Sequence, residues 1–163
     1  MYTMIKKTGK AYIAGLIDGE GCITVLKRKL RKRGLEYTLY EPHVIIAMTD
    51  RGPLDFVRKI YPGMLTSHSP KNPEYRRQYR YAATRPSVKR MVRELEPYLI
   101  NKKEQAKLMQ RFPTSLKGLP RSTQEEIYQR HIYEELKRLK GNKENMNNFD
   151  SDSLNEEMQL PLL

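Results

Sequence analysis

The chain has 163 residues, of which 31 are Lys or Arg and 19 are Asp or Glu, giving a formal net charge of +12. This length allows one domain with a real core, and the charge predicts a polyanionic partner, nucleic acid ahead of an anionic membrane. The single cysteine, Cys22, excludes an internal disulfide and a multi-cysteine zinc site. No stretch approaches the ~18 apolar residues of a membrane span, and no secretion signal follows the basic amino-terminal residues. We therefore expect a soluble protein of a reducing, intracellular compartment, with no membrane partner.

Helical periodicity is strongest around residues 12–21, and Thr8 is the expected cap of this helix. One stripe is apolar until its last member, Glu20. A second stripe carries almost no side-chain bulk and consists of Ala11, Ala14, Gly15, Asp18 and Gly19. Each glycine costs about 1 kcal/mol relative to alanine, so close approach of another helix would be the compensation. Spacing alone favours a simpler alternative, a short buried helix with a chance glycine pair and an exposed acid.

The order of the residues is a more specific signal than their helical spacing. The run Ile13-Ala14-Gly15-Leu16-Ile17-Asp18-Gly19-Glu20-Gly21, followed by a strand that begins at Cys22, closely resembles the signature of the LAGLIDADG homing endonucleases. The chain has one copy of this motif, and single-motif chains of about this length in that family act as homodimers. The resemblance extends over residues 8–112 and implies an α+β fold of order α-β-β-α-β-β-α, with an antiparallel DNA-binding sheet and extra carboxy-terminal helices.

Alternating patterns predict four strands, over residues 22–33, 36–49, 64–69 and 75–84. Six of the seven residues from 27 to 33 are cations, and the run ends at a turn signal, Gly34. Such a run is usually only a solvated surface, but cations on a strand project at intervals that suit phosphates and base edges. Val44, Ile46 and Met48 are expected to face the core. We expect the outward residues of the strands to bind DNA: Thr24, Leu26, Arg28, Leu30, Lys32, Glu41, His43, His68, Arg76, Gln78 and Arg80.

Helices are predicted over residues 53–61, 86–96, 98–111 and 122–141. The last begins with the capping-box spacing of Ser122 and Glu125, and its apolar face consists of Tyr128, Ile132, Leu136 and Leu139. Beyond Gly141 the composition changes to polar residues with five acids and one lysine. We therefore predict an endonuclease-type domain at residues 1–141 and an acidic, flexible tail at residues 142–163.

The resemblance also implies a site. Glu20, with the backbone carbonyl of Gly19, is the implied ligand of Mg²⁺, for which Mn²⁺ substitutes, beside the matching acid of a second subunit. Two adjacent carboxylates repel each other, so such a site should recruit a cation. Asp50 takes the place of a residue that positions water, and Lys102 that of a cation near the scissile phosphate. For Lys102, one more solvated surface lysine is an equally probable explanation. The resemblance gives Asp18 an interface role, bonding across to the partner helix.

The function that this resemblance implies is metal-dependent hydrolysis of phosphodiesters by a site-specific, homodimeric endonuclease of double-stranded DNA. The target would be long and pseudo-palindromic, as in intron homing, and no organic cofactor is expected. One alternative is a non-cleaving nucleic-acid-binding protein on the same scaffold, such as an intron splicing factor, a maturase or a regulator. A basic RNA-binding protein of ribosomal type also fits the charge, but it gives no reason for the bare helix stripe. The compartment is expected to be a chloroplast, a mitochondrion or a prokaryotic cytoplasm.

Overall fold

The computed structural model describes residues 5–32, 34–72, 74–113 and 123–141. The first seven elements follow the predicted order α-β-β-α-β-β-α, and further helices complete the described chain. In sequence they are α1 (Lys7–Glu20), β1 (Gly21–Lys32), β2 (Leu35–Met48), α2 (Arg51–Ile60), β3 (Gly63–His68), β4 (Gln78–Ala83), α3 (Arg85–Leu95), the 3₁₀ turn η1 (Glu96–Tyr98), α4 (Lys103–Gln110) and α5 (Thr123–Gly141). The predicted fold class is therefore confirmed. No helix in these described segments is long and apolar enough to cross a membrane.

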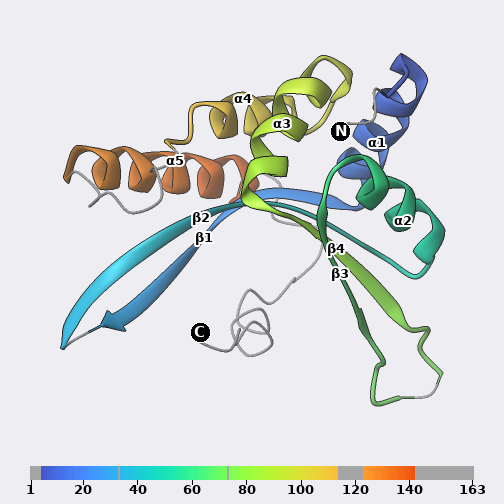
Figure 1. Ribbon diagram of the computed structural model, residues 1–163, viewed down its shortest axis with the longest axis horizontal. Helices are drawn as coiled ribbons and strands as arrows, with labels where there is room; N and C mark the ends of the chain where they lie inside the picture. The colour runs from blue at the N-terminus through green and yellow to red at the C-terminus, as the bar shows by residue number, and fades with distance from the viewer. Residues whose placement is uncertain (1–4, 33, 73, 114–122, 142–163) are drawn as a thin grey trace.

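The four strands form one antiparallel sheet in the order β1-β2-β4-β3. The pairing of β1 with β2 is long, from Gly21 opposite Ile46 to Lys32 opposite Leu35. At their connection Gly34 has a φ of 80°, a conformation that L side chains rarely adopt. Figure 1 shows that hairpins β1–β2 and β3–β4 diverge as two arms, while the labelled helices all lie on one side of the sheet. The sheet therefore has one face covered by helices and one that these helices leave open.

The core fills the space between the sheet and the helices. Ile13 and Ile17 of α1 are buried there with Ile23 of β1, and so are Val44 and Ile46 of β2, which were predicted to face inward. Met48, also predicted to face inward, is half-buried and packs against this core. The strand alternation deduced from the sequence is therefore confirmed, and with it the side that each cation on β1 takes.

Several boundaries and faces differ from the prediction. Helix α1 begins at Lys7 with Lys6 as its N-cap, so Thr8 lies inside the helix and is not the cap. Strand β4 begins at Gln78, three residues later than predicted, because its ladder with β3 stops at the pair of His68 and Gln78. Helix α2 begins at Arg51, before the expected Pro53. Ser122 and the predicted tail at 142–163 lie outside the described residues.

The two helices after α3 show the largest differences. Helix α4 begins at Lys103, five residues later than predicted, because η1 and an extended residue at Leu99 intervene. On α5 the predicted apolar face is wrong at Tyr128, which is exposed, while Gln129 is buried and donates through Nε2 to the carbonyl oxygen of Pro113 at 3.1 Å. The Gln129 amide, which bonds to Pro113, thus takes the inner position on α5 that the sequence pattern gave to the ring of Tyr128.

Candidate nucleic-acid interface and catalytic site

The open face of the sheet carries the predicted DNA-binding residues of the strands. Residues directly opposite each other in a ladder project from the same face. Thr24 is opposite His43, and Leu26 is opposite Glu41. The β4–β2 and β4–β3 ladders place Arg80 opposite Ala47 and Gln78 opposite His68, which extends the same face to β3. By register and alternation this face includes the predicted residues Thr24, Leu26, Arg28, Leu30, Glu41, His43, His68, Gln78 and Arg80, while Lys32 is the last residue of β1, paired with Leu35.

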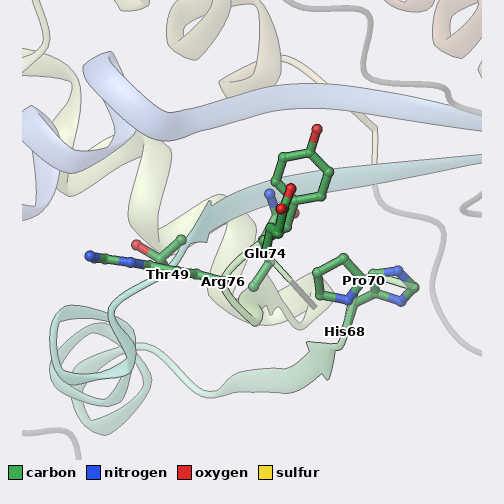
Figure 2. Close-up of a pocket in the computed structure, with 7 residues that line it drawn as sticks. Thr49, His68, Pro70, Glu74 and Arg76 are labelled. Carbon is green, nitrogen blue, oxygen red and sulfur yellow. The ribbon is translucent and has the colours of Figure 1, made fainter. Parts of the chain in front are cut away.

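Arg76 lies outside the strands, in the connection between β3 and β4. It nevertheless joins His68 and Gln78 around an open pocket of about 470 Å³ at the far end of this hairpin. Figure 2 shows how Thr49, at the end of β2, and residues of the β3–β4 connection surround it. The complete lining consists of Thr49, His68, Pro70, Glu74, Tyr75, Arg76 and Gln78. The prediction that Arg76 alternates along a strand is wrong, but the pocket brings it together with His68 and Gln78, two other predicted DNA-binding residues.

The centre of the open face holds a cluster of charged groups around His43. Burial is the main cause that lowers the pKa of His43 from 6.5 to about 4; Glu41 opposes it, and Arg28, Arg80 and Arg85 add to it. The Nδ1 atom of His43 is buried and has no hydrogen-bond partner among the described residues. We predicted a surface histidine, and the structure instead gives one that is half-buried and neutral at physiological pH.

The junction of α1 and β1 presents Glu20. The backbone N–H of Gly21 donates to the carbonyl of Ile17, and a Cβ added at Gly21 would lie 2.7 Å from the Ile17 Cα. The chain therefore passes from helix to strand at a point where only glycine fits. Gly19 and Glu20, the last two residues of α1 before this junction, are both exposed. The candidate metal ligands are thus held at a fixed place beside the sheet.

Asp18, two residues before Glu20, organises the segment that precedes α4. Its carboxylate accepts hydrogen bonds from the backbone N–H groups of Ile100, at 2.7 Å, and Lys102, at 2.9 Å. Lys102 also donates through Nζ to the backbone carbonyl of Asp18 at 2.6 Å, which satisfies one of the last carbonyls of α1. Both carboxylate oxygens of Asp18 thus accept bonds from the same chain, and the expected bond to a partner helix stays a prediction. Lys102 is thereby brought to the end of α1 that carries Glu20.

Asp50 lies at the same end of the β1–β2 ladder as Glu20. It follows β2, whose Ile46 pairs with Gly21, and it is the N-cap residue of α2 without a side-chain capping bond. Its carboxylate is exposed and accessible to solvent. Three separate connections thus supply the predicted catalytic residues: the end of α1, the end of β2 and the start of α4.

Carboxylate and carbonyl oxygens, as at Glu20 and Gly19, are the donor types that Mg²⁺ prefers. No group of three His, Cys, Asp or Glu side chains with the arrangement of a metal site occurs among the described residues. The donors at the end of α1 therefore fit a Mg²⁺ ion in type.

The small-residue stripe of α1 lies partly in the core and partly at the surface. Ala14 is fully buried in the protein's own core, so the prediction that it belongs to an intermolecular surface is wrong. Ala11, Gly15 and Gly19 are exposed, and a Cβ added at Gly15 or Gly19 would meet no atom within 4 Å. Nothing within the described chain requires glycine at these two positions.

Two residues of the open face were not predicted from the sequence. Thr66 lies opposite Arg80 on β3 and is exposed on the same face. Arg85, the first residue of α3, reaches Glu41 of β2. The alternation of β3 would have identified Thr66, whereas Arg85 joins the face through a tertiary contact that has no signal in the sequence.

The fold was compared with known proteins. No family model matches the chain, and no curated protein does so either. Among solved structures, the homing endonuclease I-CvuI, in complex with DNA, aligns with a TM-score of 0.64 and 20% identity over 82% of each chain. The archaeal intron-encoded homing endonuclease I-Vdi141I, also complexed with DNA, aligns with a TM-score of 0.54 and 15% identity over 83% of this chain and 99% of its own. The chain has the LAGLIDADG homing endonuclease fold.

This fold confirms the architecture that the motif at residues 13–21 implied. In the LAGLIDADG fold of this chain, the motif helix α1 ends where the sheet begins, so Glu20 lies beside the face that carries the predicted DNA-binding residues. The two hairpin arms of the LAGLIDADG fold supply that face, and the exposed glycines lie on the same helix as Glu20.

Proposed function

We propose that this protein is a site-specific endonuclease of double-stranded DNA that hydrolyses phosphodiesters with the help of Mg²⁺. The observation that carries the proposal is that Lys102 binds the Asp18 carbonyl, two residues from Glu20 at the end of α1, next to an open sheet face that carries cations. The net charge of +12 supports a polyanionic substrate. The structural neighbours that are homing endonucleases in complex with DNA support the same class of substrate.

The active form in this proposal is a homodimer. Gly15 and Gly19 each cost about 1 kcal/mol of helix stability relative to alanine and fill no tight space within the chain. A second α1 packed on this stripe would bring two backbones close together and offset that cost. It would also place the Glu20 carboxylates of both protomers beside each other, so that the second copy completes the ligand set.

Glu20 and the carbonyl of Gly19 would hold the metal in this arrangement. When bound, Mg²⁺ supplies an activated water and neutralises charge on the phosphate oxygens. Lys102, fixed through its backbone N–H by Asp18, presents a cation at the same end of the helix, where it would stabilise the charge that develops on the scissile phosphate. Asp50 would orient the attacking water through its exposed carboxylate.

The proposal is tested on a duplex that joins the DNA sequences flanking the gene, since the insertion site without the intervening element is the expected target. Wild-type protein should cut both strands of this duplex in Mg²⁺ or Mn²⁺. Glu20→Gln should bind it with unchanged affinity and leave it intact, because an amide is a far poorer ligand for a hard cation. Glu36→Gln, which removes an exposed acid from β2, serves as the matched control and should cut normally. Wild-type protein that binds the duplex without ever cutting it would instead support the non-cleaving splicing factor or regulator.

A further inference from the structure

A largely buried carboxylate lies in the middle of the cationic open face. Glu41 is on β2, opposite Leu26 of β1, and its side chain is only 14% exposed. Its Oε2 atom lies 3.3 Å from Nε of Arg28 on β1, and its Oε1 atom accepts a hydrogen bond from Arg85 at the start of α3. One acid thus holds two arginines that come from different elements.

This arrangement is costly for a surface that binds phosphates. A carboxylate on such a face repels the DNA backbone, and each arginine that it neutralises releases fewer counterions when DNA binds. Glu41 therefore lowers the affinity for any duplex, whatever its sequence. Its benefit is positioning, because the ion pair with Arg28 and the hydrogen bond from Arg85 hold both guanidinium groups beside Glu41 before DNA arrives. Arginines held in this way lose less conformational freedom when they meet matching groups.

Building on the proposed function, we propose that Glu41 is a specificity-determining residue that positions Arg28 and Arg85 and penalises duplexes that do not match them. Specificity is a difference between affinities, and a repulsive group raises it when only the correct partner offsets the repulsion. On the matched target the fixed arginines reach base or phosphate groups in their paired orientation. On other duplexes the Glu41 carboxylate faces phosphates without compensation.

The test compares wild type, Glu41→Gln and the control Glu36→Gln for binding to a random-sequence duplex and to the flanking-derived duplex. Glu36 is an exposed acid of the same strand whose position alternates to the opposite face, so its loss changes the net charge equally. Glu41→Gln should bind the random duplex several-fold more tightly, with a log–log salt slope steeper by about 0.9 for each arginine released. Its affinity for the flanking-derived duplex should change less, so that its discrimination falls, whereas Glu36→Gln should discriminate like wild type.

Three results would overturn the inference. Equal effects of Glu41→Gln and Glu36→Gln on binding would mean that Glu41 acts only through its contribution to the net charge. Unchanged discrimination between the two duplexes in Glu41→Gln would show that Glu41 has no role in specificity. A loss of affinity for the flanking-derived duplex alone, with random-duplex affinity unchanged, would show that Glu41 contacts a base directly. Wild-type protein that binds no duplex would overturn the proposed function itself, which separates that failure from these three.

Arg85→Gln provides a second test that leaves the Glu41 carboxylate paired with Arg28. Because Arg85 is already neutralised, this change should hardly alter random-duplex affinity in wild type, yet it should weaken binding several-fold when introduced into Glu41→Gln. Equal effects in both backgrounds would contradict the positioning role. Thermal unfolding of each variant confirms that folded protein is compared, and the Arg85→Gln comparison with wild type still applies if Glu41→Gln does not fold.

Discussion

Lys102 contacts Asp18 through two hydrogen bonds that use different parts of each residue. The Lys102 backbone N–H donates to the Asp18 carboxylate, and the Lys102 Nζ donates to the Asp18 carbonyl. The motif helix thus fixes both the backbone and the side chain of the candidate catalytic lysine. Asp18 is part of the motif, but in this chain its carboxylate positions another residue.

Asp18→Asn should slow cleavage by about tenfold or more, because an amide turns a donor toward one of the two N–H groups and leaves it unpaired. Target affinity should change much less. In a double-mutant cycle with Lys102→Met, the effect of Asp18→Asn on the cleavage rate should shrink, since the lysine it positions is already gone. Asp55→Asn on α2, an exposed acid paired with Arg51, is the control. A variant that melts earlier yet cuts at the wild-type rate per folded dimer would show a purely structural role.

Glu20→Gln combined with wild type in a mixed dimer should nick one strand or cut very poorly, since each protomer is proposed to supply one acid to a shared metal site. Ca²⁺ should support binding of the flanking-derived duplex without cutting, because it takes oxygen ligands in a looser geometry than Mg²⁺. Tandem-linked dimers with one altered copy allow the strand breaks to be counted on a denaturing gel. Full double-strand cutting by the mixed dimer at the wild-type rate would refute the shared site.

Gly15→Leu should abolish the dimer and leave the fold of the monomer largely intact, since a Cβ added at this position meets no atom within 4 Å in the chain. Gly21→Ala is the contrasting variant, because its Cβ would lie 2.7 Å from the Ile17 Cα and should destabilise the fold itself. Sedimentation measures the first effect and thermal unfolding the second. An active wild-type monomer would contradict the dimer, whatever the variants do.

Removing cations from the open face should flatten the salt dependence of DNA binding. Arg76→Ala with Arg80→Ala should lower the log–log slope by about 0.9 for each phosphate that is no longer neutralised. Lys89→Ala with Arg93→Ala removes two exposed cations from α3, on the helical side of the sheet, and should change the slope little. Equal slopes for both double variants would mean that net charge alone, and no particular face, attracts DNA.

His43 should make the free protein less stable in mild acid. Its pKa is lowered to about 4 in the folded state, so the unfolded chain binds a proton first as the pH falls below 6.5. Stability that is fully present above pH 6.5 should therefore decrease toward pH 4, by up to about 3 kcal/mol. Denaturant titrations across this range, with His43→Gln as the comparison, measure the effect. Parallel pH profiles for the two proteins would contradict a buried neutral histidine.

The strands and their faces were predictable because alternation is a local signal that burial enforces. Ile23 and Val44 marked the core side, and the opposite positions then followed without knowledge of the tertiary structure. The motif likewise identified the helix that ends at Glu20. These predictions depend on periodicity and residue order within a single element.

The failures concern contacts between elements. Helix α4 begins late because Asp18, more than eighty residues away in the chain, binds the segment before it. Ala14 belongs to the same small-residue stripe as Gly15, yet only the packing of α1 against the core decides which of them is exposed. Gln129 replaces Tyr128 on the inner side of α5 because its amide finds the Pro113 carbonyl, a partner that helical spacing cannot reveal.

Under the proposed function, the short pairing between the two hairpins has a consequence for how the protein's DNA target changes in evolution. Strands β2 and β4 pair only from Ile45 to Met48 and from Tyr79 to Ala82, whereas β1 pairs with β2 along the whole length of β1. Each hairpin arm is therefore nearly independent and is joined to the other arm only through the short β2–β4 pairing. Substitutions toward the tip of one arm leave the other arm, the β2–β4 pairing and helix α1 unaltered. New recognition can then be acquired one arm at a time, without rebuilding the machinery that cuts.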